Sequence, residues 1–211
     1  PNYVLHDALE IYEDVVFLIT TALYEVNIDY SDIIGVGITN QRETTVAWNK
    51  KTGQPIYKAI VWQSTQTNEI CEKLKVSGYE KMIKEKTGLL INPYFSASKM
   101  KWIIDNVSGA KELMDEGNLL FGTIDSWLIY KLCGGIHVTD YTNASRTMLF
   151  NIHTLDYDDE LLKLFKINRN TLPKVVSSNA TIGNISEIRI KEICNLEVCG
   201  LIGDQESSLI G

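Results

Sequence analysis

Residues 33–45 constrain the fold of this 211-residue chain more than any other segment. The segment begins as a short apolar run, residues 33–39, that contains two glycines. Small residues within such a run predict a strand that is buried on both faces and closely approached by other backbone. The run ends abruptly in polar side chains, Asn40-Gln41-Arg42-Glu43. Because α/β sheets bind ligands at the ends of their strands, this boundary is the first candidate for a functional site.

The chemistry of Arg42 and Glu43 indicates what such a site could bind. A guanidinium donates hydrogen bonds and a carboxylate accepts them, so together they can hold the neighbouring hydroxyls of a polyol. The alternative is an exposed hairpin that carries a single surface ion pair, which would contribute little to stability. These two residues by themselves leave both interpretations open.

Composition narrows the class of protein. Hydrophobic residues make up 45% of the chain, enough for a sizeable core, and there is no low-complexity run. The net charge is -7, and lysine and arginine form no basic stripe that could neutralise phosphates, so we expect no nucleic-acid or anionic-membrane partner. No apolar run approaches the length of a membrane span, which favours a cytoplasmic protein.

Strand and helix patterns alternate along the chain, as in α/β folds. Asp7 followed by Glu10 resembles a helix-capping box, and apolar spacing continues that helix to about residue 26, ahead of a turn at 27–32. β-branched residues and a glycine-containing turn predict a hairpin over residues 44–62. We expect further strands at 119–123 and 198–203, and helices at 67–76, 78–86, 96–107, 109–117, 124–132 and 155–165.

Several stretches, in order, resemble the glycerol kinase branch of the FGGY sugar kinase family. They are GITNQRETTVAW with KTGQPIYKAIVWQ, then NPYFSASKMKWIIDNV, LLFGTIDSWLIYKL, VTDYTNASRTMLFNIHTLDYDDELL and GLIGDQ. The resemblance implies a ribonuclease H-like fold of the actin and hexokinase type, with a mixed sheet flanked by helices and residues 33–39 and 198–203 as inner strands. It also implies that residues 1–211 form the N-terminal, substrate-binding domain.

The same resemblance implies an activity and a set of site residues. The activity is ATP-dependent phosphorylation of glycerol to glycerol 3-phosphate, with Mg²⁺ as cofactor. Asp204 corresponds to the general base and a Mg²⁺ ligand, and Trp62 to an aromatic wall against the carbon face of glycerol. The residues that would hold glycerol hydroxyls are Arg42, Glu43, Tyr94, Asp204 and Gln205. On local grounds alone, Asp204 could simply cap a helix and Trp62 could be a core residue.

The chain departs from the family pattern in two places. Ser64-Thr65-Gln66 stands where relatives commonly carry arginine, and Glu206 adds a carboxylate beside the proposed base. The family's first hairpin, whose loop contacts nucleotide phosphates, should precede residue 1, and most adenine contacts should follow residue 211. We therefore expect this chain to be inactive alone. The resemblance also implies that the full-length protein is a homodimer or homotetramer. The alternatives are another FGGY kinase that acts on a pentose or other polyol, and a non-catalytic polyol-binding module.

Overall fold

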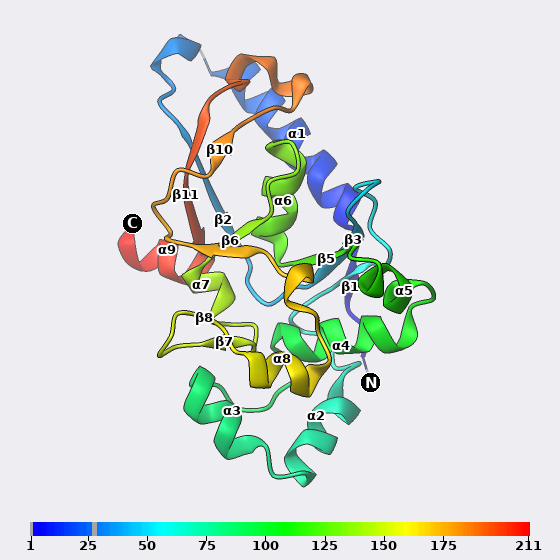
Figure 1. Cartoon of the computed structure of the whole chain (residues 1–211). Helices are drawn as coiled ribbons and strands as arrows, with labels where there is room; N and C mark the ends of the chain where they lie inside the picture. The colour runs from blue at the N-terminus through cyan, green and yellow to red at the C-terminus, as the bar shows by residue number, and fades with distance from the viewer. Residues whose placement is uncertain (1, 27–28) are drawn as a thin grey trace.

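The computed structural model describes residues 2–26 and 29–211 (Figure 1). Its longest helix is α1 (Ala8–Glu25), which begins at an Asp7 N-cap whose Oδ1 accepts a hydrogen bond from the Leu9 N–H at 2.9 Å. This confirms the expected helix start. A short 3₁₀ helix, η1 (Tyr30–Asp32), occupies the described part of the predicted turn, and residues 27 and 28 of that turn lie outside the described residues.

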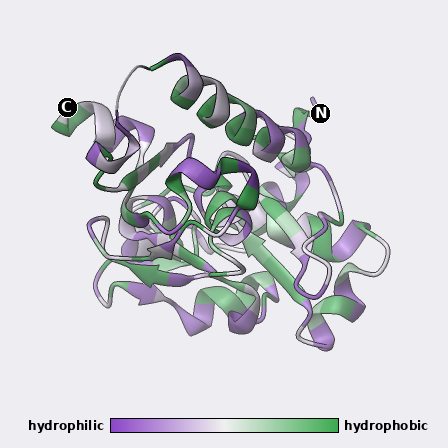
Figure 2. Ribbon diagram, turned by 90° about the horizontal axis from the view of Figure 1, so that it is seen from above, coloured by the Kyte–Doolittle hydropathy of each residue, from purple (hydrophilic) through white to green (hydrophobic). Residues whose placement is uncertain are grey.

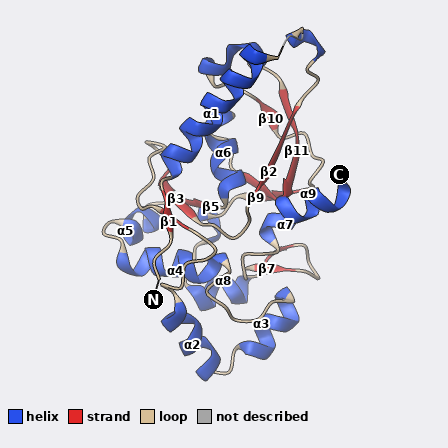
Figure 3. Cartoon of the chain, turned by 180° about the vertical axis from the view of Figure 1, so that it is seen from behind, coloured by secondary structure: helices blue, strands red, loops and turns tan. Residues whose placement is uncertain are grey.

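A three-stranded mixed sheet lies in the same half of the molecule as α1 (Figures 1 and 3). Its middle strand, β11 (Glu197–Gly203), runs parallel to β2 (Val36–Asn40) and antiparallel to β10 (Gly183–Asn184). The parallel pair brings Gly203 opposite Asn40, so both strands end together. The predicted mixed sheet and its two strands are therefore confirmed, with β11 in the middle.

The expectation that the first strand is buried on both faces is wrong. Ile38 and Asn40 are buried, whereas Gly37 and Thr39 are exposed. Successive side chains of a strand point to opposite faces, and one face of β2 packs on the core beside α6 (Ile124–Leu132) while the other lines an open hollow of about 400 Å³. The strand also starts at Val36 rather than at residue 33, because residues 30–32 are taken by η1.

The predicted hairpin forms, although its returning strand is irregular. β3 (Val46–Asn49) turns back toward β4 (Ala59–Ile60), and Thr45 and Ile60 exchange both backbone hydrogen bonds at 3.0 and 2.9 Å. Two further pairings were not predicted: β4 pairs with β1 (Leu5–His6), and β3 pairs with β5 (Leu119–Gly122). The hairpin is thus extended on both sides by distant strands.

The remaining elements surround these sheets. Helices α2 to α5 are Asn68–Val76, Glu80–Thr87, Ser96–Asn106 and Ala110–Asp115, and the later helices are α7 (Tyr141–Ala144), α8 (Asp159–Phe165) and α9 (Asp204–Ile210). The remaining strands and 3₁₀ helices are β6 (Val138–Asp140), β7 (Phe150–Asn151), β8 (Asp156–Tyr157), β9 (Lys174–Val176), η2 (Arg169–Thr171) and η3 (Ile188–Ile193). The helix expected from residue 155 begins only at Asp159, because Asp158 is its N-cap and residues 156–157 pair with β7.

Two apolar clusters make up the core. One lies around α4, α5 and α8, and the other lies between α1, α6 and the β2–β11 pair. Trp48 is fully buried in the second cluster, edge-on to Trp127 with ring centroids 5.3 Å apart. Figure 2 shows apolar and polar residues alternating along α1, consistent with one buried side. Within the described residues, the structure has no helix of the length and apolarity that crossing a membrane requires.

Candidate functional site

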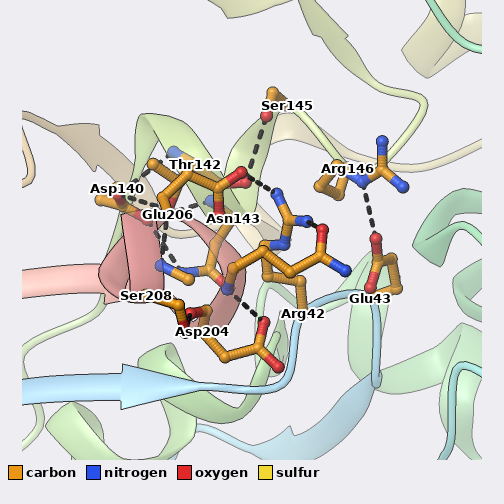
Figure 4. A network of polar contacts seen from close by, with 12 residues as sticks. Arg42, Glu43, Asp140, Thr142, Asn143, Ser145, Arg146, Asp204, Glu206 and Ser208 are labelled. Atoms are coloured by element: carbon orange, nitrogen blue, oxygen red, sulfur yellow. Dashed lines mark hydrogen bonds and ion pairs between the residues drawn. The ribbon is translucent and has the colours of Figure 1, made fainter. Parts of the chain in front are cut away.

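The candidate site lies where β2 and β11 end side by side (Figure 4). Arg42 follows β2 and points toward α9, which begins directly after β11. Its Nη2 donates to Gln205 Oε1 and its Nη1 to Glu206 Oε1, each at 2.6 Å. Arg42 is only 6% exposed, so the parallel strand pair places a buried guanidinium against the first turn of α9.

Glu43 points the other way from its neighbour Arg42. Its carboxylate accepts a hydrogen bond from Arg146 Nε at 2.7 Å, and its backbone is left-handed, with φ of 61°. Burial raises the pKa of Glu43, while Arg146 acts to lower it. Because Arg42 and Glu43 are both buried and each pairs with a distant residue, the interpretation of an exposed hairpin with a surface ion pair is wrong.

Arg146 connects this polar site to an aromatic wall. Its guanidinium lies 5.7 Å from the ring centre of Tyr94 and 4.9 Å from that of Phe95. Tyr94 in turn lies 5.4 Å from Trp62, centre to centre. Trp62 and Tyr94 are half-buried and together line a hollow of about 330 Å³. Trp62 is therefore not a plain core residue, and its ring is accessible to a ligand.

Lys99 of α4 stabilises the loop that carries Tyr94 through hydrogen bonds to its backbone. Lys99 has no exposed surface, and its Nζ donates to the backbone carbonyls of Pro93 at 2.8 Å, Tyr94 and Phe95 at 3.2 Å. Burial lowers the pKa of Lys99 to about 7. Only a weak sequence signal points to this role: Lys99 lies one helical turn before Ile103 on an apolar face.

A second buried polar group fixes the end of β11. Asp140 is fully buried and accepts five hydrogen bonds, from Thr142, Asn143 and Ser178. The Thr142 hydroxyl that donates to Asp140 also accepts from the Gly203 N–H at 2.8 Å. A chain of two hydrogen bonds therefore anchors the residue before Asp204. Asp140 and Thr142 lie within the family-like stretch VTDYTNASRTMLFNIHTLDYDDELL, but the sequence indicated no role for either residue.

Asp204 is the first residue of α9 and its side chain is exposed. The N-cap of that helix is Gly203, so the expectation of Asp204 as the capping residue is wrong in position. Its Oδ1 accepts a hydrogen bond only from the N–H of Gln205, at 2.9 Å, among the described residues. A carboxylate in the first turn is still favoured by the helix dipole and is free to meet a ligand.

The structure places the six sequence-predicted site residues in two contacting groups, which the adjacent residues Arg42 and Glu43 join. Arg42 contacts Gln205 directly, and Glu43 connects through Arg146 to Tyr94 and Trp62. Sequence reasoning missed Arg146, Lys99 and Asp140. Over residues 2–26 and 29–211, no three histidine, cysteine, aspartate or glutamate side chains gather in a way that could hold a metal by themselves.

A mixed α/β domain with polar side chains at the ends of two parallel strands matches the actin- and hexokinase-like fold of carbohydrate kinases. A sequence profile described as "FGGY family of carbohydrate kinases, N-terminal domain" matches residues 1–211. The chain therefore belongs to the FGGY family of carbohydrate kinases, as its N-terminal domain.

Named relatives refine the comparison. The chain is 52% identical to the glycerol kinase of Bacillus cereus strain G9842 over 212 aligned residues, which are 100% of this chain and 42% of that protein. It superposes on the ADP-bound glycerol kinase of Plasmodium falciparum with a TM-score of 0.94 and 36% identity, covering 100% of this chain and 42% of the other. A xylulose kinase from Lactobacillus acidophilus, 22% identical, shares the fold with a TM-score of 0.84 and covers 100% and 44%. The chain thus spans less than half the length of these relatives.

Proposed function

We propose that this chain is the substrate-binding domain of an ATP-dependent glycerol kinase, which transfers the γ-phosphoryl group of ATP to a terminal hydroxyl of glycerol. The observation that carries the proposal is the meeting of Arg42 and Gln205 at the ends of β2 and β11. Glu43, the neighbour of Arg42, connects through Arg146 to the Trp62–Tyr94 pair. The 52% identity to a glycerol kinase supports the choice of substrate.

The chemistry of these side chains fits a small polyol. The guanidinium of Arg42 has further N–H groups that can donate to hydroxyl oxygens, and the carboxylate of Glu43 can accept from hydroxyl protons. Tyr94 and Gln205 add groups that can both donate and accept. The indole of Trp62 offers a broad apolar surface to the carbon face of glycerol. These five residues thus divide between hydroxyl recognition and apolar contact.

Asp204 is the residue that we assign to proton transfer. Its carboxylate would take the proton of the attacking hydroxyl while that oxygen bonds to the γ-phosphorus and the bond from phosphorus to the β–γ bridging oxygen breaks, releasing ADP. Asp204 is exposed and makes no ion pair among the described residues, so the carboxylate is free for this role. A hard oxygen ligand of this kind also suits Mg²⁺, which when bound neutralises phosphate charge.

ADP is bound by the Plasmodium falciparum relative, and we propose that the full-length protein likewise binds ATP and Mg²⁺. A cytoplasmic location, assembly into a homodimer or homotetramer and the absence of nucleic-acid and membrane partners stay predictions from the sequence.

The test is a substrate comparison on the full-length protein. ADP formation should depend on glycerol, and glycerol should raise the thermal unfolding temperature more than xylulose or ribulose at equal concentration. Efficient turnover of xylulose or ribulose with little turnover of glycerol would assign the protein to another branch of the family. Polyol binding without any ADP formation would instead indicate a non-catalytic binding module.

A further inference from the structure

The two arginines at the candidate site are both paired with carboxylates. Arg42 Nη1 lies 2.6 Å from Glu206 Oε1, and Arg146 Nε lies 2.7 Å from Glu43 Oε1 (Figure 4). The one buried lysine beside them, Lys99, directs its Nζ to three backbone carbonyls. Among the described residues, the site therefore presents arginine as an oriented hydrogen-bond donor whose charge is already balanced.

The pair between Arg42 and Glu206 depends on the backbone beside it. A Cβ at Gly203 would collide with the side chain of Arg42 and would come within 2.8 Å of Glu206 Oε2. Glycine at this position therefore leaves the space in which the two side chains meet over the end of β11. The guanidinium of Arg42 is 6% exposed and the side chain of Glu206 is 35% exposed, so solvent screens this pair less than a surface pair.

The second carboxylate oxygen of Glu206, which is not hydrogen-bonded to Arg42, can act on a ligand that approaches the site. Glu206 Oε2 is inaccessible to solvent and has no hydrogen-bond partner among the described residues. An ionised oxygen of this kind repels any anion that approaches Arg42. An unpaired guanidinium would do the opposite, because its fork of N–H groups matches carboxylate and phosphate groups.

From this geometry we propose that Glu206 is a specificity-determining residue, which balances the charge of Arg42 so that the pocket accepts uncharged polyols and rejects polyols that carry a carboxylate or phosphate. This inference rests on the proposed function, because it concerns the site that we assign to glycerol. Arg42 keeps N–H groups beyond those bonded to Gln205 and Glu206, and these suffice for a neutral hydroxyl.

The test compares glycerol with glycerate, which has the same carbon number but carries a carboxylate. Glu206→Gln in the full-length protein removes the charge and keeps an oxygen that can accept from Arg42. Dissociation constants measured by titration calorimetry should show glycerate binding about tenfold tighter or more, from the removal of one partly screened like charge. The affinity for glycerol should change much less.

A matched control carries the same charge change elsewhere. Glu112 is exposed on α5, on the opposite side of the molecule from α9 (Figure 1), so Glu112→Gln should leave both affinities unchanged. Glu206→Ala also removes the charge and should shift glycerate affinity in the same direction, so the test does not depend on the folding of one variant.

The outcomes separate this inference from the proposed function. Normal glycerol binding with unchanged glycerate affinity in both Glu206 variants would overturn the inference alone. An equal gain for glycerol and glycerate would also overturn it, because charge would then not be what Glu206 discriminates. If glycerol does not bind the unsubstituted protein, the proposed function fails and this inference fails with it.

Discussion

Replacing Arg146 by glutamine should weaken both the fold and the polyol site, with opposite dependences on pH. Among the described residues, Arg146 is the cation that is hydrogen-bonded to the Glu43 carboxylate, and Glu43 is 2% exposed. Removing one partner of a buried ion pair costs about 3–5 kcal/mol. The side chain of Arg146 is 28% exposed, so solvent screening reduces the cost of removing it. We therefore expect a loss of about 2–3 kcal/mol in the free energy of unfolding.

The pH dependence follows from the pKa of Glu43. Burial already raises this pKa above its ordinary value of 4.5, and Arg146 opposes that rise, so the Arg146→Gln variant should have a still higher pKa. A carboxyl group with a raised folded-state pKa favours the folded state at low pH, and that contribution is lost as pH rises through the folded-state pKa. The variant should therefore lose stability more steeply than the unsubstituted protein between pH 4.5 and neutrality.

Glycerol affinity should change in the other direction over the same range. The carboxylate form of Glu43 is the form that accepts hydrogen bonds from two hydroxyls, so affinity in the variant should recover as pH rises. Urea denaturation and glycerol calorimetry at matched pH values measure the two trends, and Arg146→Lys, which keeps the charge, should restore part of both. Parallel pH slopes for Arg146→Gln and the unsubstituted protein, with equal glycerol affinity, would refute the assignment of Arg146 as the partner that keeps Glu43 ionised.

Three further substitutions in the full-length protein test the remaining site residues. Asp204→Asn should lower kcat by about 10²- to 10⁴-fold with glycerol affinity largely kept, because an amide cannot take the hydroxyl proton; near-normal kcat would remove the general-base assignment. Arg42→Ala should weaken glycerol binding by about 1.5–3 kcal/mol, the range for hydrogen bonds to charged groups, and an unchanged KM for glycerol would count against Arg42 as a ligand. Lys99→Met should raise the Kd of glycerol by loosening the Tyr94 loop. Because the pKa of Lys99 is lowered to about 7 in the folded state, the substitution should also remove the gain in stability that the unsubstituted protein shows between pH 7 and 10.5. An unaltered pH profile from urea denaturation would show that Lys99 has its ordinary pKa.

Local patterns in the sequence determined most of the secondary structure. The Asp7 cap, the glycine-ended helix α3 and the boundaries of α6 all follow from short-range hydrogen bonding and backbone preference, which neighbouring residues decide. The collinear motifs identified the family and the six proposed site residues, because those residues lie in or beside the motifs themselves.

Long-range pairing was decided only by the tertiary structure. The sequence did not indicate that β3 pairs with β5 or that β4 pairs with β1, because strand partners depend on packing across the whole chain. It also overstated the burial of β2, because an apolar run shows that a strand suits a core but not which of its faces is covered.

The ion-pair partners of the charged residues were likewise decided only by the tertiary structure. Arg42 and Glu43 are adjacent in sequence, yet Arg42 pairs with Glu206 and Glu43 with Arg146, more than 100 positions away. Glu43 is held in a left-handed conformation while β2 and β11 end together, so the two neighbouring side chains diverge toward different elements. The sequence by itself determined which residues could bind a polyol, and the tertiary structure decided which carboxylate balances each arginine, because side chains so far apart in sequence meet only when the strands and helices that carry them have packed.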